Sequence, residues 1–238
     1  MAGNDPALEA YSVRVRVSFA ECRSRYLADT NNPDLAWQLG RACFQLTTIA
    51  TNKSERAGVA KLGIDACQGL ISRNTNSLQG HYYLGANLGR LADTRRNLSG
   101  LKLVDQMERE FLISLSLGSN YDYAGPDRNL GLLYFQAPAI FSVGNRSKAQ
   151  HHLLRAVKIA PEYPDNLLNY IEALIKWNER DAARKELKVL EARWPEAQKQ
   201  FGGDDWLYDR LDWEERFDAV RKKLAPPPKA GDKSGKSN

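Results

Sequence analysis

The sequence is poor in cysteine and has no long apolar run. Its 238 residues include three cysteines, Cys22, Cys43 and Cys67, and no CxxC pair, which excludes a structural zinc site of the usual spacing. We expect buried free thiols, because free cysteine packs as a small apolar residue. A single disulfide is the alternative. Every apolar run is far shorter than the roughly 20 residues that cross a bilayer, so no membrane span is predicted.

The familiar enzyme motifs are missing as well. There is no GxSxG, no Walker A loop and no GxGxxG after a strand. Histidine is scarce, with two of the three side by side at His151 and His152. Adjacent helical residues point about 100° apart, whereas a helical zinc pair needs the i, i+4 spacing. We therefore expect no metal, no cofactor and no catalytic residue. The two histidines are predicted to be helix positions, one of them packed against a neighbour.

The charge balance and the two ends of the chain limit the remaining possibilities. The net charge of +5 is mild and gives little support to nucleic acid as a partner. Residues 226–238 are rich in proline, glycine, serine and lysine, and are predicted to be disordered beyond a single helical domain at 1–225. The first residues lack the apolar stretch of a signal peptide. We expect a periplasmic or other extracytoplasmic location if a signal segment was removed before Ala2, and a cytoplasmic one otherwise.

What the sequence does contain is a degenerate helical repeat. A small-large-small-proline pattern with spacings of 4, 3 and 5 recurs after 34 residues, at Ala149, Leu153, Ala156 and Pro161 and again at Ala183, Leu187, Leu190 and Pro195. This is the second-helix pattern of a tetratricopeptide repeat. Leucine-glycine pairs mark the first helices at Leu39-Gly40, Leu84-Gly85 and Leu130-Gly131. Because glycine inside a helix costs about 1 kcal/mol, these glycines predict close contacts between helices.

These patterns predict an all-α protein. We expect a tetratricopeptide-like right-handed helical solenoid of about four helix pairs, preceded by an N-terminal helix. The segment 204–224, with one apolar stripe, is predicted to be the C-terminal capping helix. The segment 12–19, "SVRVRVSF", alternates like a strand, but its wider context favours a helix. Insertions of roughly six to ten residues are expected between the first and second helices of the pairs.

Residues 80–195 resemble a specific family. The segments "HYYLGANLGRLA", "YDYAGPDRNLGLLYFQAP" and "GNRSKAQHHLLRAVKIAPEYPDNLLNYIEALIKWNERDAARKEL" are similar to the tetratricopeptide-like family that includes the T component associated with TRAP transporters (TatT-like). The resemblance implies a non-enzymatic protein that works outside the cytoplasm. It also implies assembly beside a substrate-binding protein, and a homo-oligomer with an internal channel.

The candidate binding site follows from the expected fold. First helices line the inner surface of such a solenoid, so groove-facing positions are counted from the leucine-glycine pairs. They are Trp37, Arg41, Gln45, Tyr82, Arg90, Arg128, Gln136, Glu172 and Lys176. This concave, basic and aromatic face is expected to bind an acidic protein segment or an anionic ligand, because arginine pairs bidentately with carboxylates. Ordinary solvated surface is the alternative.

Two further questions stay open at this point. Asp127, Arg128 and Asn129 are expected at the exposed start of a helix, where they either cap it or face the groove. For the protein as a whole, a binding scaffold is predicted. The alternatives are a cytoplasmic peptide-docking adaptor and a carrier of an apolar or anionic ligand between helices, suggested by "LLYFQAPAIF" and five tryptophans.

Overall fold

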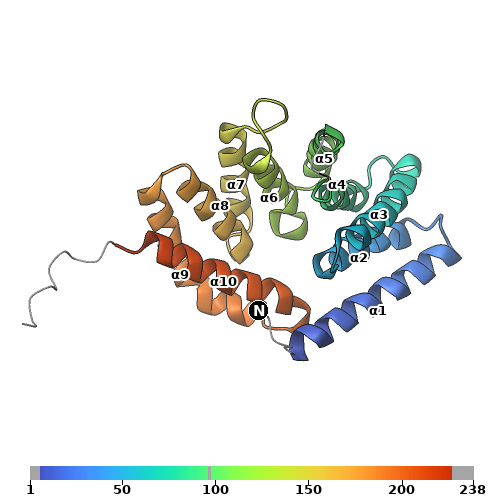
Figure 1. The fold of residues 1–238 in the computed structure, drawn as a ribbon, viewed down its shortest axis with the longest axis horizontal. Coiled ribbons are helices and arrows are strands. Elements are labelled where there is room, and N and C mark those ends of the chain that lie inside the picture. Colours follow the sequence, from blue (N-terminus) through green and yellow to red (C-terminus); the bar gives the residue numbers. More distant parts are fainter. Residues whose placement is uncertain (1–5, 96–97, 227–238) are drawn as a thin grey trace, which may run out of the picture.

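The architecture is seen in a computed structural model that describes residues 6–95 and 98–226, apart from the side chains of residues 98 and 99 (Figure 1). Within these residues the chain forms ten α-helices, one short 3-10 helix and no strand. None of these helices is both long and apolar enough to cross a bilayer. The elements are α1 (Pro6–Ala28), α2 (Pro33–Ile49), α3 (Lys53–Arg73), α4 (Leu78–Ala92), α5 (Leu98–Leu117), α6 (Tyr121–Gln136), α7 (Arg146–Ile159), α8 (Pro164–Lys176), α9 (Arg180–Gln200), η1 (Asp204–Trp206) and α10 (Leu207–Leu224).

The predicted helix pairs are confirmed. α2 packs on α3, α4 on α5, α6 on α7 and α8 on α9, with α1 before the first pair and α10 after the last. The segment "SVRVRVSF" lies inside α1 and is helical, as expected. Of the tail predicted to be disordered, residues 227–238 lie outside the described part of the chain.

The leucine-glycine pairs explain how each helix pair packs so closely. A Cβ atom added to Gly40 would lie 2.4 Å from Sγ of Cys67, and one added to Gly131 would lie 2.7 Å from the Leu153 side chain. At Gly85 the same atom would meet the ring of Phe111 at 2.8 Å. Each glycine of a first helix therefore faces the second helix of its own pair. The helix-propensity cost of glycine is offset by the close packing that the missing side chain allows.

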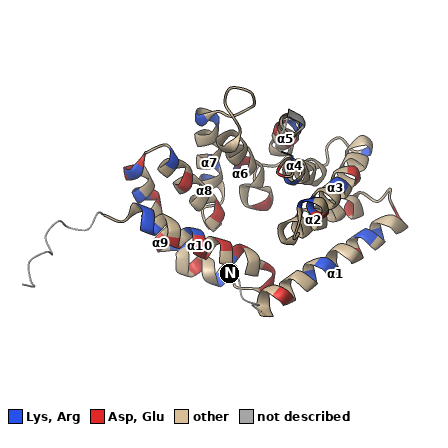
Figure 2. Ribbon diagram, in the orientation of Figure 1, with Lys and Arg blue, Asp and Glu red and all other residues tan. Residues whose placement is uncertain are grey.

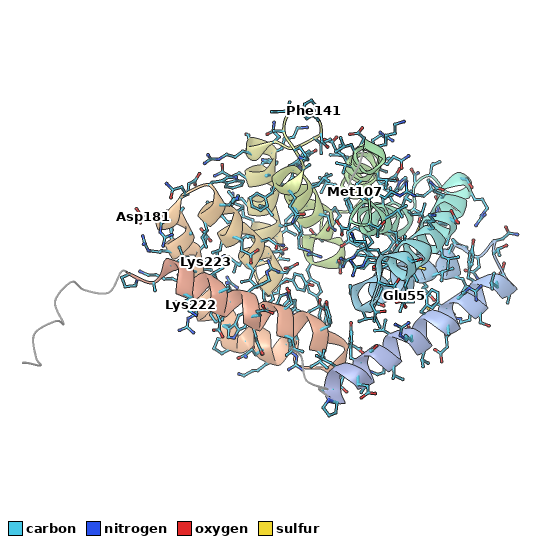
Figure 3. The ribbon with its side chains drawn as sticks, in the orientation of Figure 1. Glu55, Met107, Phe141, Asp181, Lys222 and Lys223 are labelled. Atoms are coloured by element: carbon cyan, nitrogen blue, oxygen red, sulfur yellow. The ribbon has the colours of Figure 1, made fainter. Side chains whose placement is uncertain are left out.

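The expected insertions take two forms. Between α2 and α3 the extra residues lengthen the helices, and Asn52 caps α3 by accepting a hydrogen bond from the amide of Glu55 at 2.9 Å. Between α6 and α7 they form a true loop, in which Ile140 and Phe141 are 85% and 80% exposed. Phe141 lies at the outer end of this loop (Figure 3).

The two terminal helices close the arc of helix pairs into a ring (Figure 1). The predicted capping role of α10 is confirmed, because Trp213, Phe217, Val220 and Leu224 are buried in the core that α8 and α9 build. The beginning of α10 also meets α1, where the rings of Tyr11 and Tyr208 stack with centroids 6.0 Å apart. The solenoid is therefore not an open groove, since its inner face is flanked by both ends of the chain.

Candidate functional site

Three arginines that form no ion pair with described residues lie on the consecutive helices α2, α3 and α4. We call Arg41 of α2, Arg56 of α3 and Arg90 of α4 the arginine face. In the part of the chain that the structure describes, none of the three forms an ion pair; Arg56 and Arg90 are partly buried, and Arg41 is exposed. Asp93 acts on the charges of Arg56 and Arg90 without forming an ion pair with either. Because a guanidinium group withdrawn from water without an ion pair is costly, these two positions favour an anion that is supplied from outside.

Arg90 is the least solvated member of this face. Its guanidinium lies 4.7 Å above the ring of Phe44, in a cation–π contact. Burial lowers the pKa of Arg90; the charge of Asp93 opposes this change, and the charge of Arg56 adds to it. The Arg90 Nε and Arg56 Nε atoms are both buried and have no hydrogen-bond partner among the described residues. Arg56 is thus a like-charged neighbour rather than a partner.

Aromatic rings accompany the arginines on the inner side. The indole of Trp37 stacks on Tyr83 with centroids 6.2 Å apart, and the hydroxyl of Tyr121 donates to that of Tyr83 at 3.3 Å. Arg41 is exposed and lies near enough to Tyr83 and Tyr121 to act on their pKa values. The predicted combination of cations and aromatic rings is therefore present around Trp37, Arg41 and Arg90.

Arg128 does not belong to this surface, which corrects the prediction that it is exposed. It is only 6% exposed, and Asp127 beside it is fully buried. The Nη1 atom of Arg128 donates to the backbone carbonyls of Asp122 and Tyr123, each at 3.0 Å, and Nη2 donates to the Asp122 carboxylate at 2.9 Å. Asp165 completes the set with an ion pair at 3.5 Å. All of these contacts are internal and the side chain is almost fully buried, so a partner on the inner face would not reach Arg128.

The residues that Arg128 holds form a left-handed turn at the start of α6. Asp122, Tyr123 and Ala124 have φ angles of 50°, 54° and 62°, a region that residues other than glycine rarely adopt. The turn directs the ring of Tyr123 onto that of Tyr163, at 4.7 Å between centroids. Three successive left-handed residues store strain, and the buried guanidinium offsets it by binding two of their carbonyl groups.

Tyr82 is also removed from the predicted groove. It is 4% exposed, its hydroxyl donates to the Asp122 carboxylate, and Asn129 donates to that hydroxyl at 3.1 Å. Burial raises the pKa of Tyr82 well above its usual value, with the charge of Asp122 as the next cause. Tyr82 therefore supports the left-handed turn from behind, and a partner on the inner face would not reach it.

The other predicted groove residues are scattered. Gln45 is half-buried on α2, whereas Gln136 and Lys176 are exposed in the last turns of α6 and α8. Glu172 is already paired with Arg216 at 2.9 Å. The structure thus places Trp37, Arg41 and Gln45 on α2 and Arg90 on the neighbouring α4.

Carboxylates gather around the start of α10 and the neighbouring parts of α6 and α8. Arg216 binds Asp165 at 2.6 Å and Asp212 at 3.1 Å. Asp209 has no such partner in the described chain, and its pKa is raised to about 6. The causes are burial first and then the negative charges of Asp165, Asp122 and Asp212, against the opposing charge of Arg128. Both signs of charge are mixed along the helices of the ring (Figure 2).

The histidines and cysteines take structural positions. His151 is exposed, while His152 packs on the ring of Tyr134 and bonds Asp127 through Nδ1 at 2.7 Å, as predicted for one member of the pair. Cys43 and Cys67 are buried as free thiols, and burial raises the pKa of Cys43 to about 12. Cys22 is half-buried. Among residues 6–95 and 100–226, no cluster of ligands suited to a metal ion is found.

One open pocket lies beside the left-handed turn, away from the arginine face. It has a volume of about 420 Å³ and is lined by Asn120, Asp122, Tyr123, Ile159, Ala160 and Glu162. The loop residues Ile140 and Phe141, which suggested a carrier of apolar ligands, do not line it.

Two groups on the inner side were missed from the sequence. Arg56 belongs to a second helix, in a stretch that was expected to be an insertion, so a count from the leucine-glycine pairs could not reach it. Tyr208 and Asp209 belong to the capping helix, and only closure of the ring brings Tyr208 near enough to Arg90 to affect its pKa. No spacing in the sequence signals that closure.

Comparison with solved structures identifies the architecture. A thermophilic TPR (tetratricopeptide-repeat) protein of Thermus thermophilus superposes with a TM-score of 0.62 at 17% identity, over 90% of this chain and 94% of that one. The chain has the fold of a TPR solenoid. Searches with protein-family models and against curated proteins found no match. At 17% identity the likeness to the thermophilic protein concerns the fold alone.

Proposed function

We propose that this TPR-fold protein is a non-enzymatic binding scaffold whose arginine face takes an acidic protein segment or another anionic group. The observation that carries the proposal is the arginine face, whose three members form no ion pair within the described chain and in which the charge of Arg56 acts on that of Arg90. A carboxylate placed there would relieve repulsion between Arg56 and Arg90 and would gain bidentate hydrogen bonds. The rings of Trp37 and Phe44 offer an apolar surface beside these charges.

The experiment measures binding of a fluorescein-labelled hexaglutamate peptide by anisotropy. Replacing Arg41, Arg56 and Arg90 together by alanine is expected to weaken binding by about 2 kcal/mol, or about thirty-fold, and to flatten its salt dependence. Circular dichroism should show unchanged helical content, because these side chains make no ion pair in the described structure.

A matched control removes the same charge elsewhere. Arg23, Arg109 and Arg193 are exposed on α1, α5 and α9 and likewise form no ion pair with described residues. Their triple alanine variant should bind the peptide within about two-fold of the parent. The proposal is wrong if the parent does not bind the peptide, or if both triple variants lose the same affinity.

The finer role that we propose is that of an accessory component of a solute-uptake transporter of the TRAP type, outside the cytoplasm. It is supported by the resemblance of residues 80–195 to the T-component family, within a chain whose fold is that of a TPR solenoid. The acidic segment would then belong to a substrate-binding protein. Co-purification with substrate-binding proteins encoded by neighbouring genes tests this, and the arginine-face variant should lose such a partner.

A carrier of a small ligand is the second candidate function, and the pocket of about 420 Å³ beside the left-handed turn is the observation that favours it. Ile159, Ala160 and the Tyr123 ring give that pocket an apolar part. Native mass spectrometry of the purified protein would reveal a retained ligand. A spectrum of the bare polypeptide alone would leave the scaffold as the better account.

A further inference from the structure

We propose that α1 is a gate: the contact between α1 and α10 opens to admit a partner to the arginine face and closes after it. This inference rests on the proposed function for the identity of the partner, but the gate itself is argued from the way α1 is held. In the described chain the ring is closed by this contact between α1 and α10, which we call the seam. The seam is built differently from the other helix contacts.

The first argument is that the N-terminal half of α1 is weakly anchored. Of its 23 residues only Tyr11 is buried, whereas Val13 and Val17 are 56% and 50% exposed. By contrast, α4 buries ten of its 15 residues and α8 nine of its 13. The second half of α1 is anchored, because Phe19, Cys22 and Tyr26 pack on α2 and α3 and Arg16 pairs with Glu55 at 2.8 Å. The first half, which carries the contact to α10, is the part of α1 that can move.

The second argument concerns the seam itself, which consists of few and mostly exposed contacts. Tyr11 stacks on Tyr208, and Arg14 reaches Asp204 through an ion pair of 3.9 Å between side chains that are 43% and 85% exposed. Arg14 also donates to the Asp204 carbonyl at 3.3 Å. An exposed ion pair contributes little, and one aromatic stack contributes modestly. An open state populated at roughly 0.1–10% is expected for a contact of this kind.

The third argument is that the seam adjoins the arginine face. Tyr208 lies near enough to Arg90 to raise its pKa against the larger, lowering effect of burial. The pKa of Tyr11 is raised by burial first and then by Asp209 and Tyr208, so these side chains are also neighbours. The closing contact and the unpaired arginines therefore lie together on the inner side of the ring. Movement of α1 away from α10 would widen the approach to Arg90 for a segment of another protein.

The gate is tested without any ligand by pulsed electron spin resonance. Spin labels are placed at Val13→Cys on α1 and Leu211→Cys on α10, two exposed positions, with Cys22 changed to serine. A minor population at a longer distance is expected, and Tyr208→Ala should raise the equilibrium constant for opening about ten-fold. The matched control is Tyr26→Ala, which alters an aromatic of α1 outside the seam and should leave the distribution unchanged. One narrow distance that Tyr208→Ala does not alter would overturn the gate.

The effect on the partner is tested with a reversible lock. Arg14→Cys and Asp204→Cys are joined by a short bis-thiosulfonate reagent in the same Cys22→Ser background, and hexaglutamate association is followed by stopped flow. Locking should slow association at least ten-fold, and reductant should restore it in the same sample. Equal rates before and after locking would overturn the gate. If the unlocked protein fails to bind the peptide, the proposed function fails, while the spin-label distances still decide whether α1 opens.

Discussion

Replacing Arg128 by methionine would remove the support of the left-handed turn while keeping most of the side-chain volume. The guanidinium binds the carbonyls of Asp122 and Tyr123, pairs with the carboxylates of Asp122 and Asp165, and lies 4.8 Å from the ring of Tyr163. Burial lowers the pKa of Arg128, because it disfavours the charged form. The electrostatic effects of Tyr82, Tyr163 and the two carboxylates are larger in sum and raise that pKa. Without the guanidinium, the carboxylates of Asp122 and Asp165 lose an ion pair, and the carbonyls of Asp122 and Tyr123 lose a hydrogen-bond donor.

The expected loss of stability is large. Arg128 is 6% exposed, so solvent screens its contacts little, and removing one partner of a buried ion pair costs about 3–5 kcal/mol. That is a large fraction of the roughly 5–15 kcal/mol that typically separates folded from unfolded states. Strain at three left-handed residues, no longer offset, adds to the same loss.

Urea unfolding followed by circular dichroism measures the effect on the free energy of unfolding. Arg128→Met should lower it by about 3–5 kcal/mol, and Arg128→Lys should lose less, because the charge remains while the planar fork does not. Arg193→Met, on an exposed position of α9, serves as the control and should change it by less than about 0.5 kcal/mol. A loss below about 1 kcal/mol for Arg128→Met would refute the view that this residue holds the turn.

Three other predictions follow from single positions. Gly131→Ala should destabilise the fold by about 1–3 kcal/mol in thermal unfolding, because the new methyl group would overlap a leucine of α7. A methyl group at Gly58 meets nothing within 4 Å, so Gly58→Ala should stabilise the fold by about 0.5–1 kcal/mol. Burial raises the pKa of Asp209 to about 6, so ionisation of this carboxyl favours the unfolded state. Asp209→Asn should therefore leave the free energy of unfolding nearly unchanged at pH 4 and raise it by about 1 kcal/mol at pH 8, measured against the parent at each pH. Cys43 and Cys67 should resist a thiol reagent in the native protein, and unfolding without reductant should release three reactive thiols; one reactive thiol would mean that a disulfide exists.

The helix pairs could be predicted because their signal is local and steric. Gly40, Gly85 and Gly131 each stand where a Cβ atom would overlap the facing helix, and a glycine retained inside a helix is visible in the sequence itself. The capping helix was predictable for a related reason, since Trp213, Phe217, Val220 and Leu224 recur at helical spacing.

The closure of the ring could not be predicted in the same way. It depends on the summed rotations between successive helix pairs, and small differences in each contact add up along a solenoid. The residues at the seam carry no distinctive pattern: Tyr11 and Tyr208 lie near opposite ends of the chain, and either one alone is an ordinary helical aromatic. The site was therefore predicted as an open groove, although its inner face also contains groups from α1 and α10.

The contrast between Arg128 and Arg90 shows which part of a site sequence spacing can predict. Both arginines were assigned to the inner face by counting from a leucine-glycine pair, but their surroundings differ. Arg128 follows a turn whose left-handed residues are Asp122, Tyr123 and Ala124. None of them is the glycine that would signal such a backbone in the sequence. The turn places one carboxylate and two carbonyl groups against the guanidinium. Arg90 stands near the end of α4 with an aromatic ring beneath it and a second arginine nearby, and no described carboxylate forms an ion pair with it. Spacing selects the face of a helix on which a charge lies; whether that charge is already satisfied depends on backbone geometry that the spacing does not contain.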